Sequence, residues 1–191
     1  MKILGGQFKG RKLSSPKGNA IRPTSQKIRA SIFNIIIHSP LEFKLVGANV
    51  LDLYCGTGAM GIEALSRGAA NVIFADISMT ALKFTSKNLL SIGASKQSTV
   101  LKADGRLLSN FLSPSEYGFD IVFIDAPYDN DLTLPAVKQL GEIGVLEANS
   151  VVIAEISRKE CISIPHNFSV WDDRVYGKTR ILFLGYEHKP S

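Results

Sequence analysis

The sequence has no apolar run long enough to cross a membrane. A transmembrane helix needs about 20 consecutive apolar residues, whereas the longest apolar runs here have the length of a strand and are interrupted by charged residues. The first residues, MKILGGQFKG, also lack the apolar stretch of a secretory signal peptide. These absences predict a soluble, cytoplasmic protein without a membrane partner.

Cysteine and histidine are scarce. The 191 residues include two cysteines, Cys55 and Cys161, and three histidines. Neither cysteine has a neighbour at the spacing that a zinc site or a redox-active pair requires. We therefore expect reduced thiols, as in a reducing compartment, and no metal site.

Acidic residues are absent from the first 30 positions, which hold eight of the 22 lysine and arginine residues. The rest of the chain has 14 basic and 17 acidic residues, so the net charge of +5 arises in this segment. A charge run is often only a solvated surface. Here glycines, Phe8 and alternating apolar residues indicate a folded basic element, which favours contact with nucleic acid. The candidate residues for contact with nucleic acid are Lys9, Arg11, Lys12 and Arg22.

The N-terminal segment predicts a small β-ribbon followed by a helix. Residues 3–13 alternate apolar and polar residues between glycines, a pattern typical of a hairpin. Pro23 prevents an earlier helix start, and Thr24 or Ser25 can cap a helix whose apolar residues recur at helical spacing. We expect this helix to end before Pro40.

From residue 46, short apolar strands alternate with amphipathic helices, which is the signature of a parallel sheet with right-handed crossovers. The predicted strands cover residues 50–54, 72–76, 98–102, 119–124 and 151–156. The predicted helices cover residues 59–67, 79–91, 105–112 and 132–143. Residues 169–176 and 179–186 predict an antiparallel hairpin at the end of the sheet. The predicted fold class is therefore α/β, with a mostly parallel sheet and a domain boundary that divides the chain into 1–42 and 43–191.

A glycine-rich loop follows the first predicted strand. Gly56, Gly58 and Gly61 have the G-x-G-x-x-G spacing, which permits a tight turn, a close approach of backbone to ligand, and tight packing of helix on strand. Asp76 ends the second strand, 20 residues after Gly56, where a carboxylate can accept hydrogen bonds from both ribose hydroxyls of a nucleoside. Together they predict a nucleoside cofactor, either a nicotinamide dinucleotide or S-adenosylmethionine.

Two further carboxylates bear on the choice of cofactor. Asp52 lies four residues before Gly56, where a negative charge attracts a cationic amino acid moiety, directly or through water, and repels a pyrophosphate. This favours S-adenosylmethionine, which carries a sulfonium and an ammonium group. Asp104 follows the third strand, where it either accepts a hydrogen bond from an adenine amino group or caps the following helix.

The tetrapeptide Asp125-Ala126-Pro127-Tyr128 follows the fourth predicted strand. An exocyclic amine of a nucleobase is a poor nucleophile because its lone pair is delocalised into the ring. A site that methylates it must accept its two N–H bonds, and the Asp125 carboxylate and the Ala126 carbonyl are candidate acceptors. Pro127 stiffens the loop, and Tyr128 offers a ring on which the base can stack. These four residues are the predicted catalytic residues, acting mostly by positioning.

With these motifs in place, the chain resembles the RsmD family of small-subunit ribosomal RNA guanine-N2 methyltransferases, class I enzymes that use S-adenosylmethionine. The resemblance runs nearly end to end, through ILGGQFKGRKL, IRPTSQKIRASIFNII, VLDLYCGTGAMGIEALSRGA, DAPY and YGKTRILFL. It implies a Rossmann-like domain over 43–191, an RNA-contacting segment over 1–42, and 16S rRNA within a small-subunit ribonucleoprotein as the partner. It also implies that residues 22–24 lie near the cofactor lid and that residues 125–128 hold the target amine. The residues it implies at the cofactor are Gly56, Gly58, Asp76 and Asp104.

The chain departs from the family's pattern at the catalytic loop and in the first helix. The family has Asp-Pro-Pro-Tyr or Asp-Pro-Pro-Phe, whereas this chain has Ala126 at the second position. Because the role assigned to this position belongs to a backbone carbonyl, we expect activity to survive. The family's acids near the start of the helix are replaced by Gln26 and Ala30, which makes the segment more positive.

Other functions fit part of the pattern. The 125–128 loop recognises an amine and not the ring that bears it, so an adenine-N6 or protein glutamine methyltransferase is the first alternative. The glycine spacing alone fits a nicotinamide-dependent oxidoreductase, which Asp52 and the lack of a Ser/Tyr/Lys or histidine proton-transfer set disfavour. A non-catalytic RNA-binding protein is least consistent with an intact site. A monomer is the default expectation.

Overall fold

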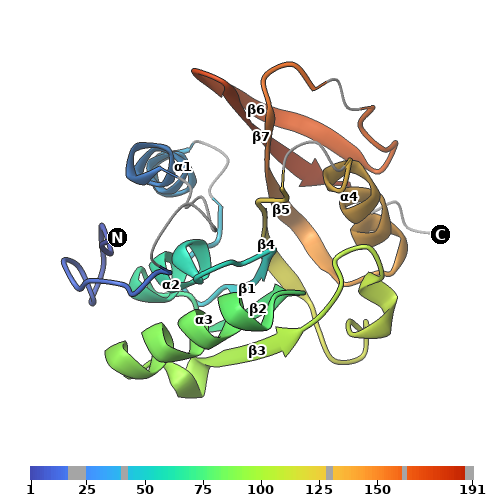
Figure 1. Ribbon diagram of the computed structural model, residues 1–191. Helices are drawn as coiled ribbons and strands as arrows, with labels where there is room; N and C mark the ends of the chain where they lie inside the picture. The colour runs from blue at the N-terminus through green and yellow to red at the C-terminus, as the bar shows by residue number, and fades with distance from the viewer. Residues whose placement is uncertain (17–24, 40–42, 128–130, 161–162, 188–191) are drawn as a thin grey trace.

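The computed structural model describes residues 1–16, 25–39, 43–127, 131–160 and 163–187. They form one seven-stranded sheet with helices on both faces (Figure 1). The helices are α1 (Gln26–His38), α2 (Ala59–Ser66), α3 (Met79–Ile92) and α4 (Thr133–Glu142), with short 3₁₀ helices η1 (Ser95–Gln97) and η2 (Leu108–Asn110). The strands are β1 (Asn49–Leu53), β2 (Asn71–Asp76), β3 (Ser98–Lys102), β4 (Phe119–Ile124), β5 (Leu146–Ser157), β6 (Phe168–Tyr176) and β7 (Thr179–Tyr186). No helix within these ranges is long and apolar enough to span a bilayer.

The strand order is β3-β2-β1-β4-β5-β7-β6. Neighbouring strands from β3 to β5 run parallel, and β7 is antiparallel to both β5 and β6. The predicted mostly parallel sheet and its C-terminal hairpin are therefore confirmed, and Gly177 forms the hairpin turn with a φ of 63°. The order reverses between β1 and β4, which is the switch point at which open α/β sheets bind ligands.

The sheet separates two hydrophobic clusters. One includes Phe33 and Phe123 and lies beneath α1, α2, α3 and residues 1–16. The ribbons of α1 and of residues 1–16 lie to the left of the sheet in Figure 1. The other lies beneath α4 and includes Leu140. The rings of Phe33 in α1 and Phe123 in β4 have centroids 5.6 Å apart, so α1 packs directly on the centre of the sheet. Burying one such ring contributes about 1.5–3 kcal/mol.

Residues 1–16, which we call the N-terminal arm, lie against the end of α2. The two halves of the arm meet in one antiparallel bridge, between Lys2 and Lys12, so the ribbon is shorter than predicted. The reason is that the intervening backbone bonds to α2 instead: the amide of Gln7 donates to the Ser66 carbonyl at 2.7 Å, and the amide of Phe8 donates to the Ser66 hydroxyl at 3.0 Å.

A buried carboxylate, Glu63 of α2, fixes the arm. It is 1% exposed and accepts hydrogen bonds from the backbone amides of Leu4 and Gly5, each at 2.8 Å. Arg67 donates to it at 2.8 Å, and the fully buried Arg29 of α1 lies 3.7 Å away. A buried carboxylate needs such donors and opposite charges to compensate for its lost hydration. The arm, α1 and α2 are thus joined at one polar centre, while the division of the chain into two domains stays a prediction.

The boundaries predicted for α1 are confirmed. Ser25 is the N-cap, and its hydroxyl accepts a hydrogen bond from the Ile28 amide at 3.2 Å. Ser39 is the C-cap, so the helix ends before Pro40 as expected. Thr24, the alternative cap, lies outside the described residues.

The helix predicted at 105–112 was wrong. Only the short η2 forms there, because Gln139 of α4 bonds the backbone in a non-helical conformation. Its amide nitrogen donates to the Arg106 carbonyl at 2.9 Å, and its amide oxygen accepts from the Leu108 amide at 3.0 Å. These bonds occupy groups that a helix would use in its own ladder.

Candidate active site

A cavity of about 510 Å³ lies at the carboxyl ends of four neighbouring strands. It spans the switch point between β1 and β4, and its volume is typical of small-molecule sites. Its lining residues lie at or after the ends of β1 (Tyr54), β2 (Asp76 and Ile77), β3 (Asp104, Gly105 and Arg106) and β4 (Asp125 and Pro127), with Leu132 just before α4. The fold therefore brings three of the predicted acids, from three different strands, to one cavity.

The glycine-rich loop turns from β1 into α2. Gly56 and Gly58 have φ values of 55° and 79°, in a left-handed region that glycine adopts without steric cost. At Gly61, a Cβ would lie 2.4 Å from the Phe74 ring, so this glycine lets α2 pack closely on β2. The turn and packing roles predicted for these glycines are confirmed, and the approach of a ligand to them stays a prediction.

Asp76 is tied to the glycine-rich loop. Its Oδ2 accepts a hydrogen bond from the Gly56 amide at 2.9 Å, and its Oδ1 accepts one from the Ser78 amide at 2.8 Å. Each carboxylate oxygen can accept a further hydrogen bond. The backbone thus orients this carboxylate while leaving it acceptor capacity toward the cavity, which suits two ribose hydroxyls.

Asp52 lies beneath the loop. It is 2% exposed, and its Oδ2 accepts a hydrogen bond from the Gly61 amide at 2.8 Å. Amides in the first turn of a helix have no partner within the helix, so Asp52 caps α2 from the neighbouring strand. Burial raises the pKa of Asp52 well above its ordinary value, and Asp125 and Asp76 add to the rise while the Gly61 bond opposes it. Sequence reasoning missed this capping role, and the predicted attraction of Asp52 for a cationic ligand stays a prediction.

Asp104 is paired with Arg106. The Arg106 Nη2 lies 2.6 Å from Oδ2 of Asp104, and the Arg106 amide donates to Oδ1 at 3.0 Å. These bonds from Arg106 hold the pKa of Asp104 at about 2. Asp104 therefore caps a turn, since the helix expected after it does not form. An adenine amino group would meet a carboxylate that Arg106 already engages.

The end of β4 delivers Asp125 and Pro127 to the wall of the same cavity. Ala126, between them, is 5% exposed, and its methyl group packs in the apolar cluster beneath α4. Tyr128 and Arg22, which complete the predicted catalytic and RNA-contacting sets, lie outside the described residues.

Tyr54 has features that sequence reasoning did not predict. Its φ of 60° is left-handed, which costs a residue with a Cβ about 1–2 kcal/mol. A Cβ on Gly105 would lie 2.5 Å from the Tyr54 ring, so Gly105 makes room for that ring. The hydroxyl is buried and finds no hydrogen-bond partner among the described residues, and burial raises its pKa to about 12. Backbone strain and an unsatisfied polar group are both typical of functional sites.

Two polar residues of α3 hold the glycine-rich loop from its other side. The Thr85 hydroxyl donates to the Gly56 carbonyl at 2.9 Å, and the Asn88 amide nitrogen donates to the Thr57 carbonyl at 3.0 Å. Thr85 and Asn88 are 0% and 1% exposed. They interrupt the apolar face of the helix at a spacing of three residues, and this pattern is the sequence signal that could have identified them.

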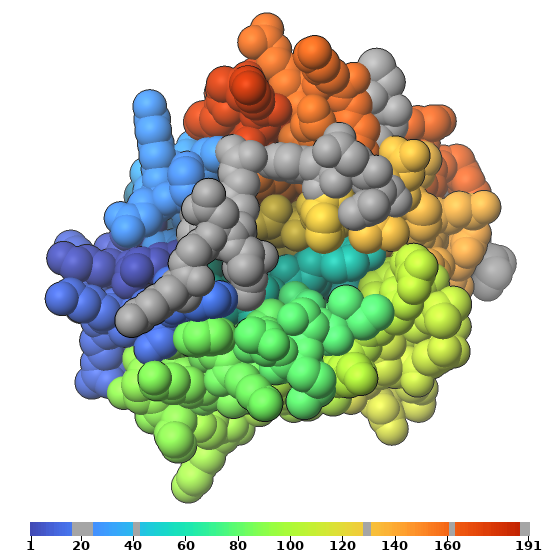
Figure 2. Space-filling view, viewed as in Figure 1, coloured from blue at the N-terminus to red at the C-terminus, as the bar shows by residue number. Residues whose placement is uncertain are grey.

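The predicted RNA-contacting residues lie apart from the cavity. Lys9, Arg11 and Lys12 are exposed on the arm, and Arg11 donates to the Ser91 carbonyl in the last turn of α3 at 3.3 Å. The cavity, in contrast, adjoins the residues just before the first turn of α3. Figure 2 shows the arm, in dark blue, beside α3, in green. The structure thus groups these three basic residues with one another and not with the candidate cofactor residues.

The structure describes one of the two cysteines, and it also bears on the metal prediction. Cys55 is a buried, free thiol, and burial raises its pKa well above the ordinary value. Cys161 lies outside the described residues. Within the described part of the chain, no group of three or more His, Cys, Asp or Glu side chains could hold a metal ion.

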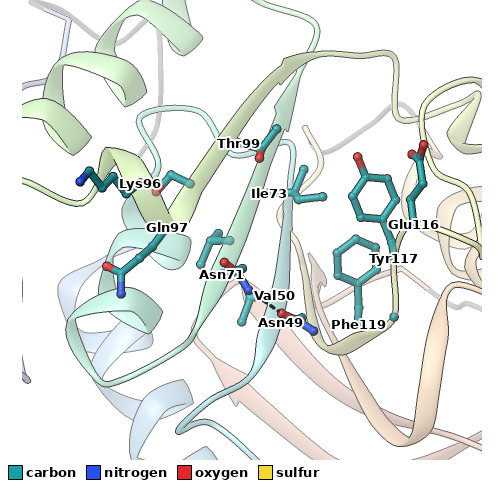
Figure 3. A pocket seen from close by; sticks show the side chains of 13 residues that line it. Asn49, Val50, Asn71, Ile73, Lys96, Gln97, Thr99, Glu116, Tyr117 and Phe119 are labelled. Atoms are coloured by element: carbon teal, nitrogen blue, oxygen red, sulfur yellow. Dashed lines mark hydrogen bonds between the residues drawn. The ribbon is translucent and has the colours of Figure 1, made fainter.

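A second cavity, of about 350 Å³, lies at the opposite, amino-terminal ends of β1 to β4 (Figure 3). Tyr117 and Phe119 form one wall with stacked rings whose centroids are 5.8 Å apart. Asn71 donates to Asn49 at 3.0 Å within the same cavity. None of the predicted site residues that the structure describes lines it. The cavity at the carboxyl ends of the strands is therefore the candidate active site.

Comparison with known proteins gives matches over nearly the whole chain. A family model described as "Conserved hypothetical protein 95" matches residues 1–185. The chain is 30% identical over 179 residues to ribosomal RNA small subunit methyltransferase D of Escherichia coli K12, covering 93% of this chain and 86% of the relative. The protein of that name from Haemophilus influenzae is 28% identical over 182 residues, covering 93% and 89%. A solved structure of the Escherichia coli protein yhhF has a TM-score of 0.83 and 27% identity, with 98% of both chains covered.

The family match begins in the arm, continues through the glycine-rich loop and the end of β4, and finishes within β7. The switch-point cavity with its glycine-rich loop and the antiparallel β7 next to β5 give the sheet the Rossmann-like form of a class I methyltransferase. From the arm to the last strand, then, the chain belongs to the RsmD family of methyltransferases.

Proposed function

We propose that this protein transfers a methyl group from S-adenosylmethionine to the exocyclic N2 amine of a guanine in 16S rRNA. The observation that carries the proposal is the shared cavity, which is lined by Asp76 beside the glycine-rich loop and by Asp125 and Pro127 after β4. In addition, the two relatives named above are methyltransferases of small-subunit ribosomal RNA by name.

The charge of the cavity supports a cationic nucleoside as the cofactor. Three carboxylates, Asp76, Asp104 and Asp125, and one guanidinium, Arg106, line it. This excess of negative charge favours a sulfonium-bearing ligand over a pyrophosphate. Asp76, oriented by two backbone amides, would hold the ribose. Asp104, which Arg106 already engages, would be a further contact to the adenine. When bound, S-adenosylmethionine supplies an electrophilic methyl group.

The residues after β4 would hold the target amine. The Asp125 carboxylate and the Ala126 carbonyl each accept one N–H of the amine, which directs its lone pair toward the methyl group. Pro127 restricts the loop, so the two acceptors keep their separation. The negative charge of Asp125 also stabilises the positive charge that develops on the amine before its proton leaves. Because the Ala126 role uses the backbone, alanine in place of the family's proline keeps the acceptor.

The arm supports RNA as the substrate. Lys9, Arg11 and Lys12 are exposed there, and the first 30 residues of the chain contain no acid. The arm is held on α2 by Glu63 and Ser66, so these charges belong to a fixed surface. Basic side chains on an anchored backbone suit the regularly spaced phosphates of RNA.

The test is transfer of an isotopically labelled methyl group to 16S rRNA and to 30S subunits from cells that lack the protein, followed by mass-spectrometric mapping. We expect N2-methylguanine at a defined position. N6-methyladenine in the digest would support the adenine alternative, and label in a ribosomal protein would support the protein alternative. Label in none of these, with folded protein, would contradict the proposal.

The cofactor is tested separately by calorimetry. Adenosylhomocysteine is expected to bind, and NAD is expected not to bind at the same concentration. Binding of NAD alone would contradict the choice of cofactor and support an oxidoreductase.

A further inference from the structure

Asn88 of α3 joins the N-terminal arm to the glycine-rich loop. Its Oδ1 accepts a hydrogen bond from the Ser14 amide at 2.7 Å, and its Nδ2 donates to the Ser14 carbonyl at 3.1 Å. The same Nδ2 donates to the Thr57 carbonyl at 3.0 Å. Thr57 lies between Gly56 and Gly58, so one side chain holds both the end of the arm and the loop beside the candidate active site.

The bond from Asn88 to Thr57 is buried, and the two bonds between Asn88 and Ser14 are partly buried. Asn88 is 1% exposed and Thr57 is 4% exposed, so water does not readily replace the bond between them. The amide orientation is fixed by its partners, because a reversed amide would turn its NH₂ group toward the Ser14 amide and its oxygen toward two carbonyls. A displaced arm would therefore leave buried polar groups unpaired, which is unfavourable. The positions of the arm and the loop are linked through this amide.

Within the part of the chain that the structure describes, the other anchors touch the arm or the loop but do not bridge them. Glu63 and Ser66 bond the arm to α2. Thr85 and Asp76 bond the loop through the Gly56 backbone. Asn88 is thus distinguished by contact with both.

We propose that Asn88 is a positioning residue that couples RNA binding at the arm to cofactor binding at the loop. The inference rests on the proposed function, because it requires the arm to contact RNA and the loop to contact S-adenosylmethionine. Each ligand stabilises the same docked arrangement of arm and loop. Each ligand therefore increases the affinity of the protein for the other ligand. Thermodynamic linkage requires the two affinities to increase by the same factor, which we call the coupling factor.

The test measures the affinity of the full-length protein for a 16S rRNA fragment with and without saturating adenosylhomocysteine, and the reciprocal affinity of adenosylhomocysteine with and without RNA. We expect each ligand to tighten the other about fivefold or more, at the lower end of known couplings. In Asn88→Ala the factor should fall to about one, because the link between the sites is removed.

Two matched variants separate coupling from general stability. Glu63→Gln weakens the arm anchor and leaves the loop bonds intact, whereas Thr85→Val removes a loop bond and leaves the arm bonds intact. Both are expected to change single-ligand affinities while keeping most of the coupling factor. An undiminished factor in Asn88→Ala, or an equal loss in all three variants, would overturn the inference.

Hydrogen exchange tests the coupling independently of the affinities. RNA binding should slow exchange at residues 56–61 in the native protein and not in Asn88→Ala. Equal exchange in β4 of both proteins would show that the variant is folded. If RNA binding also slowed hydrogen exchange at residues 56–61 in Asn88→Ala, the inference would be contradicted. Normal adenosylhomocysteine binding without any RNA binding would instead contradict the proposed function, and this inference with it.

Discussion

At the scale of single residues, we expect the substitution of Asp125 to affect methyl transfer most directly. Asp125→Ala removes one proposed acceptor for the target amine. We expect kcat/KM to fall about 10²–10³-fold, as when one preorganised polar contact is lost, because the amine is no longer held toward the methyl group. Affinity for adenosylhomocysteine should change less than about twofold, because the lost contact is to the substrate. Steady-state methyl transfer and calorimetry measure the two effects.

The matched control for this prediction is Asp125→Asn. It keeps one oxygen acceptor at nearly the same position and should retain more activity than the alanine variant. Full activity of Asp125→Ala would remove the amine-orienting role from this residue.

Arg106 controls the ionisation of Asp104. A carboxyl whose pKa is lowered on folding stabilises the protein above its unfolded pKa, and this stabilisation is lost as the pH falls through the folded value, here about 2. Arg106→Ala should therefore raise the pKa of Asp104 toward its ordinary value of 3.8, as measured by NMR titration of the carboxyl carbon. Asp173, whose pKa is lowered by Arg180, should not respond. An unshifted Asp104 midpoint would show that Arg106 is not the cause.

Residues differ in how far the sequence predicts their roles. Asp76 and Asp125 were predictable as neighbours of one cavity because the carboxyl ends of parallel strands share one edge of the sheet. Glu63 was not, because an acid in a helix normally faces water. It is buried because the arm covers it, through a contact with Leu4 that spans 59 positions of sequence.

At the scale of elements, the docking of the arm on α2 depends on Gly6. Gly6 has a φ of 75°, and a Cβ there would lie 1.7 Å from the backbone carbonyl oxygen of Ser66. Gly6→Ala should lower the free energy of unfolding by more than the roughly 1–2 kcal/mol that a left-handed residue with a Cβ costs, because the arm must also move away from α2. Urea denaturation measures the change.

Gly10 offers the matched control. It has a φ of 85°, and nothing lies within 4 Å of a Cβ there. Gly10→Ala should therefore show the conformational cost alone. Equal losses in the two variants would mean that the contact with Ser66 contributes nothing.

Elements that are stabilised by their own residues were predicted correctly, whereas segments held by distant residues were not. α1 has its own cap at Ser25 and was predicted with its limits. The segment 105–112 contains helix-compatible residues, but Gln139 of α4 bonds its backbone from a distant part of the chain. In the arm, likewise, the backbone amides of Leu4, Gly5 and Phe8 bond to side chains of α2 and not to a partner strand. Local patterns predict locally stabilised elements, and in these two segments tertiary hydrogen bonds prevailed over them.

At the scale of the whole molecule, positive charge gathers on the arm. Replacing Lys9, Arg11 and Lys12 together by glutamine should weaken RNA binding and flatten its salt dependence. Each lost phosphate contact lowers the slope of log K against log salt by about 0.7–0.9, so the total change should approach about two to three units. Binding titrations at several salt concentrations measure the slope.

The control carries the same change in net charge at other exposed positions. In this control, glutamine replaces Lys138 on α4, Lys159 after β5 and Lys178 in the β6–β7 turn. All three lysines are exposed. This variant should keep nearly the native slope. Equal flattening by both variants would mean that net charge, and not the arm, determines the RNA affinity.

The long reach of the arm's contacts has a consequence for how the protein is made. Leu4 bonds to a residue 59 positions later, and Ser14 bonds to one 74 positions later. Since a chain emerges from the ribosome with its N-terminus first, the arm is synthesised before α2 and α3 and has no docking surface until they have followed. Slowing translation between the codons for α2 and α3 should therefore prolong the time for which the nascent arm is accessible to protease.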